Sequence, residues 1–514
     1  MNRQTRNQIR SQRRAERAAG GRLPQIPFGA LCHRYPPIGP LTDEQIEEVH
    51  SASLEILRDA GIEVMSRVVR DRFAKEGARV DHESGLVYVD PDLVMALVSQ
   101  APSEITLTPR NPNHALHLGG DRMYFGMVSG PPNVHDCVQG RRAGNFADYQ
   151  KLIQLGQAFN VISMFGNQAV ATTDLAVSTR HLDCYEANLR LSDKIFSAIP
   201  IGRGRVKDAV EMVAIARGLS VEELRSSPGL IANINVNSPR KLDEAMSDGA
   251  LALAEFGQPV IVTPFTLLGA MTPVTMAAAL VQQNAEALLG ISMVQLFFPG
   301  SPVVYGGFTS NVDMRSGAPA FGTPENAKAN LAGGQMARRY GLPYRTSACN
   351  ASNAADAQSV YETLMAMWGG VMGNGNLIYH AAGWLEGGLV ASFEKVIIDV
   401  ELIQHIVQML QPIDTQSEEL GVEAIRAVDP GGHFFGAEHT MSRYETAFYS
   451  PILSDWQNNE NWVANGAKDA TMRATDVWQS VLAEAETPPL DVARQDALTD
   501  YVARRKREIG SGEP

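Results

Sequence analysis

Small polar and aromatic side chains are the residues of this sequence whose types and positions could do chemistry. They lie at or near the ends of short runs of β-branched and aromatic residues, and they are Asn233, Asn235, Phe265, Tyr305, Phe308, Arg315, Ser347, Cys349, Asn350, His380, Trp384 and Glu386. Carboxylates are few among them, and no two have the spacing that a glycosidase or a divalent metal site favours. The set therefore points away from hydrolysis and metal catalysis.

The aromatic members of this set suggest a kind of ligand. Phe265, Tyr305, Phe308 and Trp384, together with Tyr379, stand at or beside the ends of three of the runs. Such rings are most often core residues, but several that converge on one opening could form a cage for a quaternary ammonium group. Each cation–π contact in such a cage contributes roughly 0.5 to 2 kcal/mol.

The amide, thiol and imidazole groups each allow a structural and a functional interpretation. Asn233, Asn235 and Asn237 alternate along one run, so they face one side of a strand and would bond a ligand, one another or water. Cys349 has no histidine near it in the sequence, and we predict that it is not a nucleophile, because free cysteine often packs as a small apolar residue. His380 is expected to donate a hydrogen bond to substrate or scaffold, since the chain has no H-E-x-x-H pattern.

These residues lie on a repeating unit of strand, polar tip and helix. The eight runs cover residues 123–128, 161–166, 195–201, 230–236, 259–264, 302–307, 343–347 and 377–381. Within residues 121–412 they predict an α/β fold, a (β/α)8 TIM barrel, whose typical length is roughly 250 residues and whose reactive groups lie at the C-terminal ends of the strands. The alternative, an open doubly wound sheet, would need a glycine-rich phosphate loop where the chain has Gly130-Pro131-Pro132.

Three further regions flank the predicted barrel. Residues 25–120 predict an N-terminal α/β module, with a capping box at Thr42 and Gln45 and a helix that follows Asp90. Residues 413–514 predict a C-terminal helical cap, in which His433 and His439 have a structural role. Residues 1–24 predict a disordered basic tail.

Composition narrows the class of protein. At 514 residues and 44% hydrophobic, the chain can bury a large core. The net charge is −13, but the first 22 residues hold seven arginines and one glutamate, so the remainder carries −19 and should repel nucleic acid. No apolar run approaches the roughly 20 residues that span a bilayer, and the four cysteines form no C-x-x-C pair. We therefore expect a soluble, cytoplasmic protein.

Five stretches carry a resemblance to a known family. They are residues 311–325 (NVDMRSGAPAFGTPE), 337–344 (ARRYGLPY), 356–358 (DAQ) with Tyr361 and Glu362, 392–399 (SFEKVIID), and 430–435 (PGGHFF) with His439 and Thr440. On these residues the chain resembles the trimethylamine methyltransferase family, in its non-pyrrolysine, glycine betaine methyltransferase-like branch. The resemblance extends over nearly the whole chain.

The resemblance implies a substrate and a partner. It implies a (β/α)8 barrel that transfers a methyl group from an amine to the cobalt(I) of a separate corrinoid protein. Archaeal members that act on trimethylamine carry pyrrolysine near the position of Cys349 or Asn350, where this chain has ordinary residues. A quaternary amine is therefore the implied substrate, glycine betaine first, with carnitine, proline betaine, choline and trimethylamine as alternatives. The carboxylate of glycine betaine would need donors such as His380, Arg315 or Asn235.

The same resemblance implies that the cobalamin belongs to the partner. Because this chain has no D-x-H-x-x-G cobalamin signature, we expect it to bind no cofactor tightly. We also expect a homo-oligomer. Two other functions stay open: a barrel that binds or senses quaternary amines without turnover, and an isomerase or lyase that uses Cys349.

Overall fold

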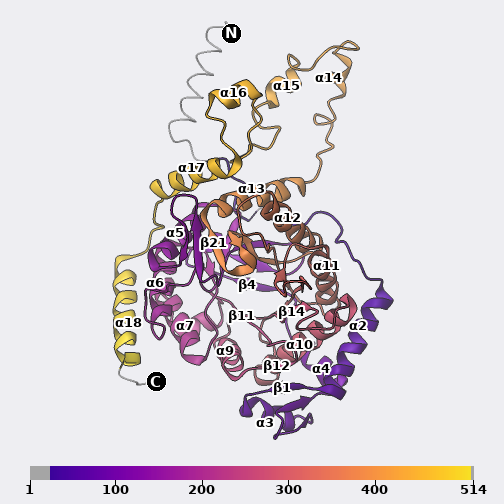
Figure 1. Ribbon diagram of the computed structural model, residues 1–514, viewed down its shortest axis with the longest axis vertical. Helices are drawn as coiled ribbons and strands as arrows, with labels where there is room; N and C mark the ends of the chain where they lie inside the picture. The colour runs from indigo at the N-terminus through magenta and orange to yellow at the C-terminus, as the bar shows by residue number, and fades with distance from the viewer. Residues whose placement is uncertain (1–22, 30, 511–514) are drawn as a thin grey trace.

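Eight parallel strands form the centre of the fold (Figure 1). The computed structural model describes residues 23–29 and 31–510, so the predicted tail of residues 1–24 lies almost wholly outside the described residues. The strands are β6 (Tyr124–Met127), β9 (Ile162–Phe165), β10 (Ile195–Phe196), β11 (Ala232–Ile234), β13 (Val260–Val262), β15 (Val303–Gly306), β18 (Tyr344–Ser347) and β19 (Leu377–Ala382). Their order is β10-β9-β6-β19-β18-β15-β13-β11, and a parallel bridge between Ser197 and Ile231 joins the two end strands. The fold is therefore a (β/α)8 barrel, and each of the eight predicted runs overlaps with one of its strands, although β19 extends one residue beyond its run.

A ring of helices surrounds the barrel (Figure 1). Polar side chains begin most of them: Asn145, Asp243, Thr323, Asp356 and Ser392 each accept a hydrogen bond from a backbone N–H of the first turn. The helices are α5 (Phe146–Ala158), α6 (Arg180–Leu191), α7 (Arg203–Arg217), the short α8 (Val221–Arg225), α9 (Glu244–Glu255), α10 (Met276–Phe297), α11 (Pro324–Arg339), α12 (Ala357–Met372) and α13 (Phe393–Met409).

The N-terminal end of the barrel is closed by a hairpin. Its strands, β4 (Ile105–Leu107) and β5 (Leu116–Leu118), are linked through the 3-10 turn η2 (Pro112–His114). The apolar residues of the hairpin pack on the inward side chains of the barrel, which are Tyr124, Met164, Ile195, Ile231, Ile261, Val304, Leu377 and Tyr379. Because this end is filled, any chemistry belongs at the other end, where the strands finish.

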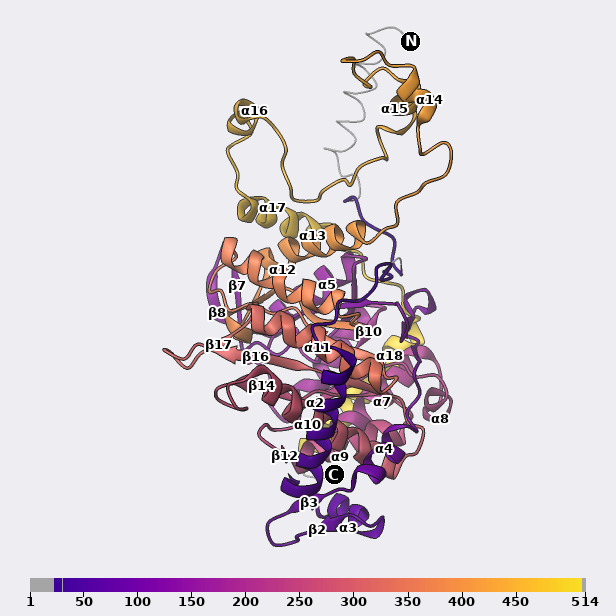
Figure 2. The same cartoon turned by 90° about the vertical axis from the view of Figure 1, so that its right-hand side faces the viewer.

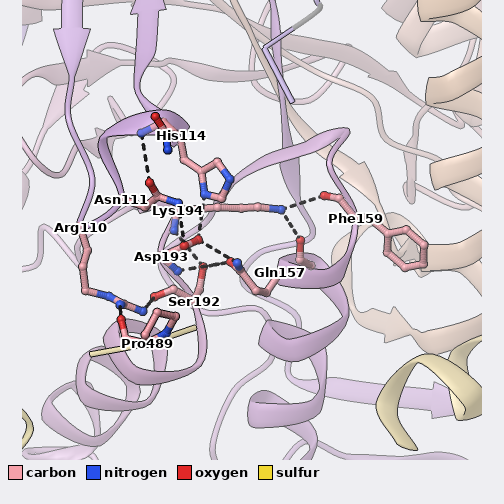
Figure 3. Close-up of polar contacts among 11 residues, drawn as sticks. Arg110, Asn111, His114, Gln157, Phe159, Ser192, Asp193, Lys194 and Pro489 are labelled. Atoms are coloured by element: carbon pink, nitrogen blue, oxygen red, sulfur yellow. Dashed lines mark hydrogen bonds and ion pairs between the residues drawn. The ribbon is translucent and has the colours of Figure 1, made fainter. Parts of the chain in front are cut away.

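Hydrogen bonds around Asp193 fasten the hairpin to the barrel (Figure 3). Asn111 and His114 of the hairpin lie 2.9 and 2.8 Å from the carboxylate of Asp193, which also accepts from Gln157 at 2.7 Å. Burial alone would raise the pKa of Asp193, but these hydrogen bonds hold it below its usual range. The adjacent Lys194 is buried and donates to two backbone carbonyls at the end of α5, and burial lowers its pKa to about 7.

The N-terminal module is attached to the barrel through a shared sheet. Its strands β1 (Ile62–Val64), β2 (Arg79–Val80) and β3 (Leu86–Tyr88) continue into β12 (Lys241–Leu242) of the barrel region, in the order β12-β1-β3-β2. Helices α2 (Asp43–Glu55), η1 (Ile56–Ala60), α3 (Arg67–Lys75) and α4 (Pro91–Val98) complete it. The capping box at Thr42 and Gln45 is confirmed, as is the helix after Asp90.

Two small sheets extend the C-terminal end of the barrel. One contains β14 (Phe265–Leu268), β16 (Phe308–Val312) and β17 (Pro319–Ala320). The other contains β7 (Asn133–Asp136), β8 (Gly140–Ala143), β20 (Trp384–Leu385) and β21 (Val390–Ser392), with the turn η3 (Glu386–Gly388) between the last two strands. They carry five of the twelve sequence-predicted site residues, namely Phe265, Phe308, Arg315, Trp384 and Glu386.

The C-terminal region is helical and lies on the flank of the barrel. An arm, residues 411–469, projects away from the barrel and carries α14 (Val422–Arg426), α15 (Glu438–Arg443) and α16 (Asn459–Ala464) (Figure 2). None of these three helices has a buried residue. The chain then returns in α17 (Ala470–Ala483), which packs on α13, and in α18 (Val492–Gly510), which packs on α6 and α7.

Candidate functional site

Aromatic rings gather where β13, β15 and β19 end. Phe265 of β14 and Phe308 of β16 are paired in register across the small sheet, and their ring centroids lie 4.9 Å apart. Phe321, which follows β17, lies 5.4 Å from Phe308. We call these three rings, with His380 and Trp384, the aromatic cluster.

Trp384 joins the cluster from the loop after β19. Its ring lies 4.3 Å from that of His380, and it meets Phe308 and Phe321 edge-on at 6.4 and 6.3 Å. Phe321, His380 and Trp384 are buried, whereas Phe265 and Phe308 are partly exposed. Phe265 and Phe308 therefore border the solvent, and the other three members lie behind them.

A buried polar network holds Trp384 in place. The indole N–H donates to the backbone carbonyl of Asn350 at 3.1 Å, and the Asn350 side-chain amide donates back to the carbonyl of Trp384. The Asn350 amide also donates to Thr363 of α12 at 3.1 Å, and Lys395 of α13 donates to the same hydroxyl at 3.0 Å. Lys395 forms a fully buried ion pair with Asp399.

His380 has an unusual backbone. Its φ of 55° is left-handed, in a stretch where the pairing of β19 with β6 shifts register between Ile378 and Ala382. A non-glycine residue in this conformation costs roughly 1 to 3 kcal/mol and such strain clusters at functional sites. The irregularity places the imidazole Nδ1 3.2 Å from Ser347 Oγ and 3.6 Å from Cys349 Sγ. Burial, helped by the charge of Arg345, lowers the pKa of His380 well below its usual value, so the ring is neutral.

Cys349 is an enclosed thiol. It is fully buried, and burial raises its pKa well above the usual range, although Arg345 and Ser347 act in the opposite direction. A thiol that stays protonated is a poor nucleophile. The geometry thus favours the sequence-based prediction that Cys349 does not attack substrate.

Arg345 lies beside the aromatic cluster, and the sequence analysis did not single it out. It lies on β18, is only 2% exposed, and its guanidinium carbon stands 4.7 Å above the ring of Tyr379 and 5.4 Å from that of Phe308. One long hydrogen bond, 3.5 Å, reaches the carbonyl of Gly307, and Nε has no partner. Burial lowers the pKa of Arg345 to about 10, so the group remains charged at neutral pH. The sequence did carry a signal for this residue, because an arginine stands within a run that predicts a buried strand.

Comparison with known proteins places this chain in a family. The model of the trimethylamine methyltransferase (MTTB) family matches residues 6–510. The chain belongs to this family. It is 33% identical to the glycine betaine methyltransferase of Desulfitobacterium hafniense (strain Y51) over 471 residues, which cover 91% of this chain and 98% of that protein. The protein is therefore a methyltransferase.

Two further relatives share a smaller fraction of identical residues with this MTTB family member. The trimethylamine methyltransferase MttB of D. hafniense (strain DSM 10664 / DCB-2) is 29% identical over 91% of this chain and 94% of its own length. MttB of Methanosarcina barkeri is 28% identical over 88% and 92%. A solved structure, the M. barkeri monomethylamine methyltransferase, covers 88% of this chain and 90% of its own, at 9% identity and a TM-score of 0.47.

Most of the sequence-predicted site residues of this MTTB family member come together. Phe265, Phe308, His380 and Trp384 contact one another as rings, and Ser347, Cys349 and Asn350 lie against His380 or Trp384. Glu386 lies beside Trp384 in the chain, where its carboxylate pairs with Arg141 at 3.0 Å. Phe321 is a further ring that the sequence analysis did not single out.

Tyr305, Arg315 and the two asparagines do not join the cluster. Tyr305 points outward from the barrel, where its hydroxyl donates to Asn284 of α10 at 3.0 Å. Arg315 is exposed in the turn between β16 and β17. The asparagines at positions 233 and 235 bond each other at 2.9 Å, and Oδ1 of the first is buried without a partner.

The site of this methyltransferase has no sign of a metal centre of its own. Within residues 23–29 and 31–510, no group of three or more His, Cys, Asp or Glu residues could hold a metal ion. His433 is exposed on the arm, and His439 is partly buried there.

No helix in the described part of the chain combines the length and apolar character needed to cross a bilayer.

Proposed function

We propose that this methyltransferase takes a methyl group from a quaternary amine and transfers it to the cobalt(I) of a separate corrinoid protein, with glycine betaine as the first candidate substrate. The aromatic cluster carries the proposal, because its neighbouring rings lie 4.3 to 6.4 Å apart at the end of the barrel. A trimethylammonium group makes weak hydrogen bonds but is attracted to aromatic faces. The similarity to a protein named glycine betaine methyltransferase supports this substrate class.

The proposed reaction needs no proton transfer by the protein. The corrinoid supplies a cobalt(I) nucleophile that accepts the methyl group, and the electron pair of the broken C–N bond stays on a neutral tertiary amine. The residues therefore have to hold the cation with one methyl group directed out of the barrel. A neutral His380 and a protonated Cys349 fit this role, since neither is asked to act as an acid or a base.

One assay tests the proposal. Glycine betaine, carnitine, proline betaine, choline and trimethylamine are each offered to the purified protein together with reduced cobalamin, and loss of the cobalt(I) absorbance is followed. We expect at least one quaternary amine to give protein-dependent loss, and the purified protein itself to be colourless because the corrinoid belongs to the partner. Failure of every quaternary amine, also with a cognate corrinoid protein, would contradict the proposal.

The second candidate is a barrel that binds quaternary amines without turnover. The same aromatic cluster favours it, because cation–π binding alone requires nothing more. Calorimetric titration distinguishes the two functions when it is run beside the cobalt(I) assay. Tight binding without cobalt(I) consumption would support binding without turnover and would reject the proposed transfer to cobalt(I).

A further inference from the structure

Arg345 is a buried charge without a counter-ion. None of the carboxylates in the described residues forms an ion pair with it, and the titratable groups that oppose the lowering of its pKa by burial are Tyr379, Cys349 and Tyr344 rather than carboxylates. Moving an unpaired charge out of water costs several kcal/mol, so buried charges are normally paired. Here the described chain supplies two ring faces and one long hydrogen bond instead.

The guanidinium lies against the proposed site. Phe308 is shared, since its ring is 5.4 Å from the Arg345 guanidinium carbon and 5.6 Å from the ring of His380. On the other side of Arg345, the hydroxyl of Tyr379 is buried and has no hydrogen-bond partner. The N–H at Nε of Arg345 and the O–H of Tyr379 are therefore two unused donors at the base of the aromatic cluster.

We propose that Arg345, with Tyr379 beside it, binds the carboxylate of the substrate, so that the substrate class is a zwitterion with a quaternary ammonium at one end and a carboxylate at the other. The inference rests on the proposed function and adds the residue that binds the negative charge of the substrate. A guanidinium and a carboxylate form strong, charge-assisted hydrogen bonds, which would satisfy the donors that the chain leaves open. The ammonium end then lies on Phe308 and its neighbours.

The same residue would select against amines that lack an acid group. Choline and tetramethylammonium offer the same ammonium head, but they would bring a second positive charge close to Arg345 in a site of low dielectric. A zwitterion cancels that repulsion with its own carboxylate. Arg345 is thus a specificity-determining residue as well as a binding residue.

The alternative is that Arg345 only stabilises the barrel through Tyr379 and Phe308. The two roles differ in the protein without ligand. If the charge is held for substrate, its replacement by an apolar residue of similar length removes an uncompensated cost, and the melting temperature stays equal or rises. If Arg345 is structural, the same replacement lowers the melting temperature.

The experiment compares Arg345→Met, Arg345→Lys and the wild-type full chain by calorimetric titration and by melting temperature. Glycine betaine, choline and tetramethylammonium are the probes, and Arg67→Met, an exposed arginine of α3, is the matched control. We expect wild type and Arg67→Met to bind glycine betaine at least about 100-fold more tightly than choline. In Arg345→Met the affinity for glycine betaine should fall about 100-fold, that for choline should stay equal or improve, and the unliganded protein should melt no earlier.

Arg345→Lys keeps a positive charge and should retain part of the preference. Equal affinity for glycine betaine in wild type and Arg345→Met would overturn the inference. A wild type that binds choline as tightly as glycine betaine, or that binds no carboxylated amine, would overturn it too. The cobalt(I) assay separates this outcome from failure of the proposed function. Arg345-dependent binding of glycine betaine without methyl transfer rejects only the function, whereas equal transfer from choline and glycine betaine rejects only the role of Arg345.

Discussion

At the scale of single residues, the site combines a cationic group with rings that attract cations. Trp384 contributes a large face but is also buried at 6% exposure and hydrogen-bonded to Asn350. His380 keeps a strained backbone and a neutral ring beside it. Under the proposed function, we expect these residues to hold the substrate in place rather than to supply an acid, a base or a nucleophile.

Replacing Trp384 by Leu should weaken quaternary amine binding by about 1 to 2 kcal/mol, because apolar bulk remains while the ring quadrupole is lost. The lost indole hydrogen bond should also cost about 1 kcal/mol of stability. Calorimetric titration with glycine betaine measures the first effect and urea unfolding the second. Trp384→Phe, which keeps a ring, is the control. If Trp384→Leu binds as tightly as wild type, the ring is core and Phe265 or Phe308 binds the cation.

Cys349→Ser should keep methyl transfer within about tenfold of wild type, which corresponds to roughly 1.4 kcal/mol in the barrier. The reason is that the buried thiol stays protonated and that its contact with His380 is long, at 3.6 Å. The cobalt(I) assay measures the rate, and circular dichroism checks that the variant folds. A loss of a thousandfold in a folded variant would show that the sulfur takes part in the reaction.

At the scale of elements, the helices behind the site determine where its loop lies. Lys395 and Asp399 are one turn apart on α13, and Asp399 also accepts from the backbone N–H of Gly383 at 2.9 Å. Burial lowers the pKa of Lys395, and it raises that of Asp399 despite the lysine beside it. The pair thus links α13 and α12 to the loop that carries Trp384.

Lys395→Met should destabilise the protein by about 3 to 5 kcal/mol, because it leaves a buried carboxylate without its partner. The double variant Lys395→Met/Asp399→Leu should recover most of that loss, since both charges are then absent. Urea unfolding of the two variants and wild type provides the comparison. A double variant as unstable as the single one would mean that the pair is needed for its hydrogen bonds to Thr363 and Gly383.

The hairpin that closes the barrel should contribute to acid sensitivity through Asp193. Its folded pKa is lowered, so this stability is present above the unfolded pKa of about 3.9 and is lost as the pH falls below it. Asp193→Asn should therefore be less stable than wild type at pH 6, and the difference should shrink as the pH approaches 3. Thermal unfolding across this range tests it. A difference that does not change with pH would show that Asp193 acts through shape alone.

At the scale of the whole molecule, the arm of residues 411–469 is the part that the fold leaves uncovered. Ile413, Phe435 and Phe448 are each more than 80% exposed, and Trp456 is 73% exposed. In Figure 2, α14 and α15 lie on the opposite side of the molecule from β16 and β17, which extend the end of the barrel that carries the site. A corrinoid protein docked on that end would leave these two helices exposed, and we expect a second copy of the chain to cover the apolar side chains near them.

We predict that the protein is a homo-oligomer and that a Phe435→Glu/Phe448→Glu variant has a lower oligomer mass at the same concentration. Burying two carboxylates in an apolar interface is unfavourable, whereas both side chains are exposed within one copy. Light scattering coupled to size-exclusion chromatography measures the mass. Val68→Glu, at an exposed position of α3, is the control. A monomeric wild type would contradict the prediction.

The sequence by itself determined the barrel and pointed to most of the residues that meet at the end of its strands. The alternation of short apolar runs with helical patterns located all eight strands, and the rings Phe265, Phe308, His380 and Trp384 were identified because reactive groups of a barrel stand at strand ends. Local signals sufficed there, since strand period, caps and turn residues act over a few neighbours.

Only the tertiary structure decided which side each strand residue faces. In a parallel strand covered on both sides, inward and outward positions are equally apolar, so alternation does not distinguish them. Val304 therefore faces the barrel interior and Tyr305 the helices, contrary to the role expected for the tyrosine. The same ambiguity hid Arg345 within β18, while Arg315, named among the possible carboxylate donors, is exposed. The bond from Lys395 to Thr363 likewise depends on two helices meeting, which no spacing in the sequence records.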